Sequence, residues 1–268
     1  MNVLSLFDGI SCGQIALNRA GIKYDKYFAS EIDKSAIKVT QANYPNTIQL
    51  GNVTKVKAED LPKIELLIGG SPCQGFSFAG KQLNFEDPRS KLFFEYVRLI
   101  EECKPKYFLL ENVKMKKEHQ DVISKYLSCE PFKINSALFS AQNRQRLYWT
   151  NIPFDGKMQD KGILLKDVLE SGFTERQKSF CLLASGNPSN RPAYLRRYIN
   201  KSIGNCKLKT EFGRRVIENL EILTPLEWER LQTVPDNYTA CVSNLKRFHA
   251  LGNGWTVDVI AHIFKGIT

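Results

Sequence analysis

The chain has 268 residues, 43% of them hydrophobic, which is enough to bury one large core or a core and a small second lobe. No apolar run approaches the roughly 18 residues of a membrane-spanning helix, and the first residues predict a strand rather than a signal peptide. Seven cysteines without a Cys-x-x-Cys pair argue against a disulfide framework and a zinc site, and favour a reducing cytoplasm.

Over the first ~150 residues, short apolar runs alternate with helix-like stretches, which predicts an α/β fold with a doubly wound, mostly parallel sheet. We expect strands at residues 3–7, 27–30, 48–50, 66–68, 107–110, 133–138 and 147–150. We expect helices at residues 13–20, 34–43, 91–103 and 120–127. Periodicity is lost near residue 154 and returns with helices at 225–232, after Thr224 as N-cap, and at 257–264.

These changes divide the chain into a first domain at residues 1–153, a small lobe at 154–215 and a return to the first domain at 216–268. The lobe carries most of the formal net charge of +10. Between residues 176 and 215 there are ten Lys or Arg residues and one acidic residue, Glu211, so this segment contributes a net charge of +9. A basic run is most often a solvated surface, but so one-sided a balance also suits a phosphate backbone.

The most informative motif is Gly-Gly-Ser-Pro-Cys-Gln-Gly at residues 69–75, which follows an apolar run at 64–68. Glycine lets a ligand approach the backbone closely, and Pro72 restricts the backbone before Cys73. Thiolate is the strongest nucleophile among ordinary side chains, so this turn could present a catalytic Cys73. The alternative is a buried structural cysteine in a strand-to-helix turn.

Three polar turns follow successive predicted strands. Residues 7–13 (Phe-Asp-Gly-Ile-Ser-Cys-Gly) lie at the first strand-to-helix turn, where a ligand can meet backbone N–H groups. Glu31 follows the second strand, where a carboxylate is well placed to bind a ribose diol, and Asn52 follows the third. Each signal is weak alone, because surface loops are rich in such residues. Together they predict a nucleoside-cofactor site, and no P-loop sequence occurs.

Two further motifs carry charged groups. Glu111, in Leu-Leu-Glu-Asn-Val, is expected at a strand tip on the same sheet edge as Cys73, where its carboxyl could hydrogen-bond a ring nitrogen; the alternative is an exposed glutamate. Gln142, Arg144 and Arg146 alternate before the last strand of this region. Alternate residues of an extended segment share a face, so we expect the three side chains to point together, unless the segment is a solvated polar edge.

The order of these motifs resembles that of the DNA (cytosine-5)-methyltransferases, and the resemblance covers nearly the whole chain. The matching segments are the cofactor loop at 7–9, the nucleophile motif at 70–74, the glutamate motif at 111–113, the arginine motif at 142–146, the late helix at 223–232 and the closing motif at 251–255.

Some residues depart from the common family pattern. Gly254-Trp255 replaces the usual Ser-Val of the closing motif and, with residues 7–10 and 144–149, is similar to the animal de novo branch and some phage enzymes. Asn52 stands where many members have Asp, and the Cys-Phe-Thr signature of the branch that acts on transfer RNA is absent. The resemblance is therefore to a small prokaryotic or phage type, expected in the cytoplasm of a bacterial cell or phage-infected host.

The resemblance implies a doubly wound, Rossmann-like methyltransferase that methylates C5 of a flipped cytosine in double-stranded DNA. It implies that Cys73 attacks C6, that Glu111 stabilises N3 and the exocyclic amine, and that Arg144, with Arg146 in the same motif, stabilises the carbonyl O2. It implies a target-recognition lobe at 154–215. Because this lobe is only about sixty residues long and offers few groups that can read bases, we expect a short target of about two to five base pairs.

The resemblance also implies the ligand contacts. S-adenosylmethionine would be held by Phe7, Asp8, Gly9, Ile10, Ser11, Cys12, Gly13, Glu31, Ile32, Asn52, Val53, Gly70, Pro72, Asn253, Gly254 and Trp255. DNA would be contacted by Gln74, Ser77, Lys81, Gln82, Arg89, Arg191, Arg196, Arg197 and Lys201, with residues 77–89 as a loop that closes over the flipped base.

Other functions stay open from the sequence alone. The same chemistry could act on RNA, and an inactive DNA-binding regulator would need none of Cys73, Glu111 and Arg144. An adenine-amine methyltransferase is disfavoured, because its Asp/Asn-Pro-Pro-aromatic loop is replaced here by Ser-Pro-Cys. No metal and no membrane partner is expected, and a cognate nuclease is a candidate partner that the sequence does not identify.

Overall fold

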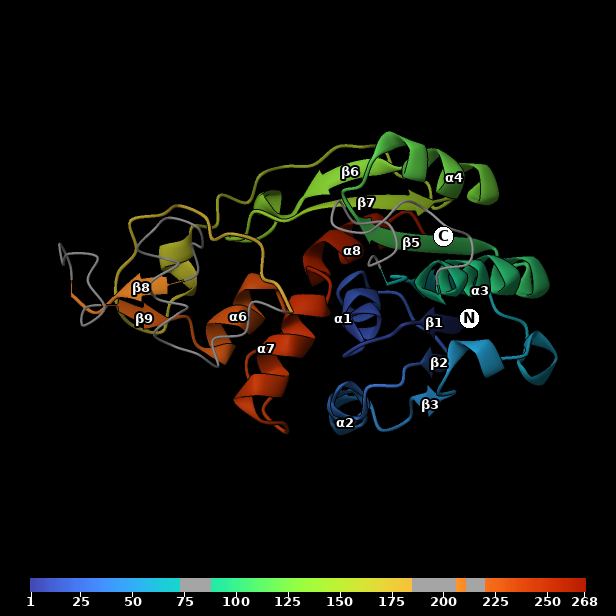
Figure 1. Ribbon diagram of the computed structural model, residues 1–268, viewed down its shortest axis with the longest axis horizontal. Coiled ribbons are helices and arrows are strands. Elements are labelled where there is room, and N and C mark those ends of the chain that lie inside the picture. The colour runs from blue at the N-terminus through green and yellow to red at the C-terminus, as the bar shows by residue number, and fades with distance from the viewer. Residues whose placement is uncertain (73–87, 185–205, 211–219) are drawn as a thin grey trace. The chain divides into compact units, whose positions relative to one another are not determined.

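The computed structural model describes residues 1–72, 88–184, 206–210 and 220–268. The chain packs as two compact units (Figure 1). Unit 1 comprises Met1–Ile134, Gln145–Gly156 and Ile260–Thr268, and unit 2 comprises Asn135–Arg144 and Lys157–Val259. These units divide the chain differently from the predicted boundaries at 153/154 and 215/216, because unit 1 extends to Gly156 and unit 2 includes Asn135–Arg144 and continues to Val259.

Unit 1 is built on a seven-stranded sheet with the strand order β3-β2-β1-β4-β5-β7-β6 (Figure 1). The strands are β1 (Asn2–Leu6), β2 (Lys26–Ser30), β3 (Ile48–Gln49), β4 (Leu66–Gly69), β5 (Tyr107–Val113), β6 (Phe132–Asn135) and β7 (Gln145–Thr150). The neighbours from β3 to β5 are parallel, whereas β7 is antiparallel to β5. The connection between β6 and β7 is too short for the crossover of about a dozen residues that a parallel pair needs. Because the neighbouring strands from β3 to β5 are parallel, the prediction of a mostly parallel, doubly wound sheet is confirmed.

The helices of this unit follow the sequence pattern closely. They are α1 (Cys12–Arg19), α2 (Lys34–Asn43), α3 (Pro88–Cys103) and α4 (Lys117–Leu127), with short 3-10 turns η1 (Val53–Lys55) and η2 (Ala58–Asp60). The bounds predicted for α2 are confirmed, and Asp33 begins the helix because its carboxylate accepts from the N–H groups of Ser35 and Ala36. The helix α3 begins at proline, which has no N–H that the first turn would leave unpaired.

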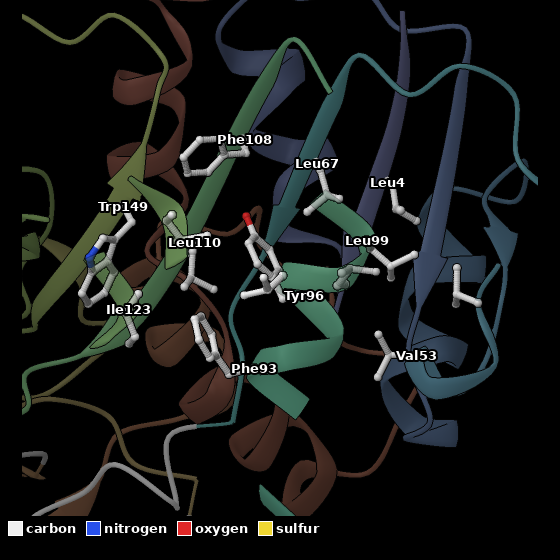
Figure 2. Packing of buried hydrophobic residues seen from close by; sticks show 14 of the residues in the cluster. Leu4, Val53, Leu67, Phe93, Tyr96, Leu99, Phe108, Leu110, Ile123 and Trp149 are labelled. Carbon is white, nitrogen blue, oxygen red and sulfur yellow. The ribbon is translucent and has the colours of Figure 1, made fainter. Parts of the chain in front are cut away.

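The apolar core of unit 1 lies between α3 and the sheet (Figure 2). Phe93, Tyr96 and Leu99 point from α3 toward the strands, where they pack with a cluster that includes Leu67 and Leu110. All five side chains are fully buried. Burying one side chain of this size contributes about 1.5–3 kcal/mol, so this layer holds the strand ends that carry the predicted motifs in place.

Unit 2 has little sheet and several short helices. Its elements are η4 (Ser136–Leu138), η5 (Leu165–Val168), an antiparallel pair of β8 (Cys206–Leu208) and β9 (Leu220–Ile222), α6 (Pro225–Leu231) and α7 (Asn244–Asn253); α8 (Val257–Phe264) begins in unit 2 and ends in unit 1. The predicted N-cap is confirmed: Thr224 accepts from the Glu227 N–H, and Glu227 accepts from the Thr224 N–H. The helix α7 and strands β8 and β9 were not predicted.

Candidate active site

A charged pair lies where β5 and β7 meet. Arg146 Nε of β7 donates to Glu111 Oε1 of β5 at 2.9 Å, and each side chain is only 12% exposed. The prediction that Glu111 ends its strand is wrong, because β5 continues to Val113 and pairs with β7 over these residues. A charge-assisted hydrogen bond of this length orients both groups, so a planar ring with polar edges would meet a fixed acceptor and a fixed cation.

The residue after Glu111 points to the nucleophile motif. Asn112 Nδ2 lies 3.2 Å from Ser71 Oγ and 3.4 Å from the Ser71 carbonyl oxygen, and both residues are buried. Ser71 is two residues before Cys73, which lies outside the described residues. Asn112 therefore anchors the segment after β4 to β5. No role was predicted for Asn112, although its place beside Glu111 in the sequence was a usable signal.

The first strand-to-helix turn has an unusual backbone. Phe7, Gly9 and Ser11 all have positive φ, of 57°, 60° and 60°. A side chain at Gly9 would meet no heavy atom within 4 Å, so the backbone of this turn borders open space. Gly13 is needed for the opposite reason, because a Cβ there would lie 2.5 Å from a methyl group of Ile68. The turn is thus open toward a ligand and tightly packed beneath.

Glu31 connects this turn to the end of β2. Its carboxylate accepts the N–H groups of Gly9 at 2.8 Å, Ile32 at 2.7 Å and Asp33 at 2.8 Å. A carboxylate has about four acceptor positions, so one remains for a ligand hydroxyl. The neighbouring Ile32 side chain is 72% exposed, which is unusual for a large apolar group and suits contact with a flat aromatic ring.

At the third strand end, the Asn52 side chain caps η1, since its Oδ1 accepts from the N–H and hydroxyl of Thr54. That oxygen already accepts two hydrogen bonds within the protein, although a cofactor contact was predicted for Asn52. Val53 is buried and packs in the core.

Asp8 in the first turn is held by hydroxyl groups. Its Oδ1 accepts from the Tyr27 hydroxyl at 2.8 Å, and its Oδ2 accepts from the Ser11 hydroxyl at 2.7 Å. Burial of the carboxyl raises the pKa of Asp8 to about 6, and these hydrogen bonds offset only part of that effect. A carboxyl group with this pKa changes charge within an accessible pH range.

The arginine motif is divided between the two units. In unit 2, Arg144 donates to the carbonyl oxygens of Leu182 and Gly254, both at 2.9 Å, and to that of Gly252 at 3.2 Å. Arg146 belongs to unit 1, where it pairs with Glu111. The predicted common face does not form one set of contacts, because β7 begins only at Gln145 and the residues before it are held by other partners.

Unit 2 brings three predicted motifs together. Gln142 donates to the Gln232 side chain and to the Leu231 carbonyl oxygen, and accepts from the Leu182 N–H. Gln232 in turn donates to the carbonyl oxygens of Leu251 and Gly254. The arginine motif, the late helix and the closing motif therefore share one buried hydrogen-bond network, while Asn253 itself is exposed and Gly254 and Trp255 are half-buried.

Several of the predicted catalytic and DNA-contacting residues fall outside the part of the chain that the structure describes. Cys73, Gln74, Ser77, Lys81, Gln82, Arg191, Arg196, Arg197 and Lys201 lie outside the described residues, and the side chain of Arg89 in α3 is not described. Within the described parts of the chain, no helix is long and apolar enough to cross a membrane, and no group of His, Cys, Asp and Glu side chains is arranged to hold a metal ion.

Comparison with known proteins finds methyltransferases as relatives. A type II methyltransferase of Lactococcus lactis subsp. cremoris, M1.ScrFI, is 31% identical over 302 residues, which covers 96% of this chain and 75% of the relative. The orphan methyltransferase M.Rho11sI of Bacillus phage rho11s is 38% identical over 188 residues, which covers 64% of this chain but only 37% of the relative, so the chain spans less than half of that protein.

The fold has solved counterparts. The Entamoeba histolytica methyltransferase EhMeth superimposes with a TM-score of 0.78 over 100% of this chain and 99% of its own, at 17% identity. The sequence itself matches the family described as C-5 cytosine-specific DNA methylase in two overlapping segments, residues 1–221 and 170–268. Because these segments span the whole chain, the protein belongs to the C-5 cytosine-specific DNA methylase family.

Proposed function

We propose that this chain transfers a methyl group from S-adenosylmethionine to C5 of a flipped cytosine in duplex DNA, through a transient bond between Cys73 and C6. The observation that carries the proposal is the Glu111–Arg146 pair, an acceptor and a cation fixed 2.9 Å apart on adjacent strands. A cytosine ring presents complementary groups on one edge: the exocyclic amine can donate to the carboxylate, and the carbonyl O2 can accept from the guanidinium.

The cytosine ring needs help to react at C5. Attack of the Cys73 thiolate on C6 pushes electron density into the ring, and C5 then accepts the methyl group. Glu111 stabilises N3 and the amine while charge builds up. A base next removes the C5 proton, the C5–C6 double bond re-forms and the thiolate leaves. Such a fixed electrostatic partner is typically worth about 10²–10³ in rate.

We assign the contact with O2 to Arg146 rather than to Arg144. Both terminal nitrogens of Arg144 already donate to carbonyl oxygens of the protein, and the residue is only 3% exposed. Arg146 instead lies beside Glu111, the residue that would bind the same edge of the ring. Arg144 is thus a positioning residue that holds the backbone of the closing motif.

The first turn fits the cofactor. Open space at Gly9, the carboxylate of Glu31 and the exposed side chain of Ile32 match an amino-acid tail, a ribose diol and an adenine ring. When bound, S-adenosylmethionine supplies a methyl group activated by its sulfonium charge. In this proposal Glu31 orients the ribose and Ile32 packs on the adenine.

DNA binding is the remaining part of the proposal. A stacked base is out of reach, so the target must be flipped at a cost of a few kcal/mol. The net charge of +9 between residues 176 and 215 would bind phosphates, and the lobe would read a short target in the major groove.

The proposal is tested by trapping and by single-turnover kinetics. A duplex with 5-fluorocytosine should give a covalent adduct on Cys73 only when the cofactor is present, and an adduct on another cysteine would contradict the assignment. Arg146→Ala should slow methyl transfer about 10²–10³-fold at saturating cofactor. Arg144→Ala should instead lower the free energy of unfolding, because it leaves buried carbonyl oxygens without their donor. Competition with transfer RNA would reveal an RNA substrate.

A further inference from the structure

Asp8 is a half-buried residue whose carboxyl group the proposed reaction does not use. It lies between Phe7 and Gly9, in the turn that borders open space, and its side chain faces Tyr27 and Ser11. A buried carboxylate normally has a cationic partner, because burial of an isolated charge is unfavourable. In the described part of the chain, Asp8 receives only hydroxyl hydrogen bonds and has no Lys or Arg partner.

The charged groups around Asp8 make the turn negative. Glu31, at the end of β2, repels the Asp8 charge and binds the adjacent Gly9 N–H. The other titratable neighbours are Tyr27 of β2 and Tyr24 just before it, and the pKa of Tyr24 is raised to about 12, mainly by burial. Neither tyrosine ionises near neutral pH. The local field near neutral pH therefore depends on two carboxylates, which favour a ligand that carries positive charge.

The hydrogen bonds of Asp8 also lead away from the ligand side. Ser11, which donates to Asp8, accepts from Gln14 Nε2, and Gln14 Oε1 accepts from the Tyr24 hydroxyl. Donors on both carboxyl oxygens stabilise the ionised form, while burial opposes it. This balance leaves the Asp8 charge responsive to a nearby cation.

We propose that the carboxylate of Asp8 makes the cofactor site prefer the positively charged sulfonium of S-adenosylmethionine over the neutral thioether that remains after methyl transfer. This inference rests on the proposed function, because it concerns the same ligand site. The two ligands share the adenosine and the amino-acid tail and differ by one methyl group and one positive charge. An ionised Asp8 attracts that charge, so it favours binding of the substrate form and release of the product form.

The charge on Asp8 sets a definite pH dependence. Below its pKa of about 6 the carboxyl is neutral and the preference for the sulfonium is small; above it the preference is fully developed. The ratio of the two dissociation constants cancels contributions that are common to both ligands. The three histidines, His119, His249 and His262, lie in α4, α7 and α8 rather than in this turn.

The test is calorimetric binding of S-adenosylmethionine and S-adenosylhomocysteine to the full chain between pH 5 and 7.5. The preference for the sulfonium ligand should rise about tenfold over this range, the size expected for two unit charges about 12 Å apart at an effective dielectric constant of about 20. Near pH 6, binding of the sulfonium ligand should release protons to the buffer, because it lowers the pKa of Asp8. Binding of the thioether should release fewer.

Three variants sharpen the test. Asp8→Asn should remove the pH dependence of the ratio, whereas Asp25→Asn, which changes an exposed carboxyl group beside the N-terminus, should retain it. Tyr27→Phe removes a hydrogen bond to the ionised Asp8, so the midpoint should move to higher pH even if Asp8→Asn does not fold.

The outcomes separate the two proposals. A ratio that does not change with pH in the wild-type chain, or a midpoint that Tyr27→Phe leaves in place, would overturn the role of Asp8 while the cofactor assignment stood. Failure of both ligands to bind at any pH would overturn the cofactor assignment itself, and the role of Asp8 with it.

Discussion

The two units use carboxylates that are shielded from water for different purposes. In unit 2, Glu227 pairs with Lys207 at 2.7 Å and Glu229 pairs with Arg247 at 3.0 Å, and both carboxylates are fully buried. In unit 1, Glu111 pairs with Arg146 at the candidate active site, whereas Asp8 in the first turn is held by hydroxyl groups alone. A paired buried charge specifies how segments join, whereas an unpaired one is sensitive to a ligand's charge. The difference indicates that unit 2 uses charge to hold its chain together and that unit 1 uses it at the ligand site.

The buried pairs compensate for the small amount of regular structure in unit 2. Glu227 joins β8, through Lys207, to α6, and it also accepts the Glu170 N–H. Glu229 accepts the N–H groups of Asn237 and Thr239, and so holds the segment between α6 and α7. In unit 1 the comparable role falls to the apolar layer between α3 and the sheet. The following predictions test this comparison.

The largest effect is expected at the Lys207–Glu227 pair. Lys207→Met leaves Glu227 buried without its cation and should lower the free energy of unfolding by about 3–5 kcal/mol. Urea unfolding followed by tryptophan fluorescence measures it, with Trp228 in unit 2 and Trp149 in unit 1. The double variant Lys207→Met with Glu227→Gln should recover much of the loss; if it does not, packing rather than charge explains the effect.

Apolar packing should dominate in unit 1. Leu99→Ala removes a fully buried side chain of α3 and should cost about 2–5 kcal/mol, depending on how far the cavity collapses. The matched control is Leu245→Ala in α7, where the side chain is 47% exposed and a change within about 0.5 kcal/mol is expected. Equal losses in the two variants would contradict the placement of the core.

Asp8 should lower stability at neutral pH. Its folded-state pKa of about 6 lies above the ordinary 3.8, so the folded chain binds more protons between these values and stability falls as pH rises through them. At pH 7, the free energy of unfolding of Asp8→Asn should therefore exceed that of the wild type by up to about 3 kcal/mol. This difference should disappear near pH 4. Unfolding curves at the two pH values decide it, and a constant difference would contradict the titration of Asp8.

The smallest effect is expected at the start of α6. Thr224→Ala removes the hydroxyl that accepts the Glu227 N–H and should cost about 1 kcal/mol. Thr224→Ser keeps the acceptor and should stay close to wild type in the same urea experiment. A loss as large as that of Lys207→Met would mean that the cap, rather than the buried pair, holds α6.

The sequence alone predicted the strands and helices of unit 1 well. Apolar runs of the right length, separated by glycine and proline, indicate the elements of a parallel α/β sheet because each strand there is buried on both faces. The order of the motifs along the chain also identified the family. Glu111, Arg146 and the turn at Gly9, which belong to these motifs, lie in or after strands of that sheet. These features depend on local pattern and chain order, which a sequence contains directly.

Only the tertiary structure decided how the polar residues divide their roles. Arg144 and Arg146 are arginines two residues apart in the same motif. Arg144 nevertheless donates to carbonyl oxygens of the closing motif, whereas Arg146 pairs with Glu111. The sequence also gave no sign that Lys207 and Glu227 form a buried pair, or that Asp8 lacks a cation. Each role depends on partners distant along the chain and on the exclusion of water, and both arise only when the chain has folded.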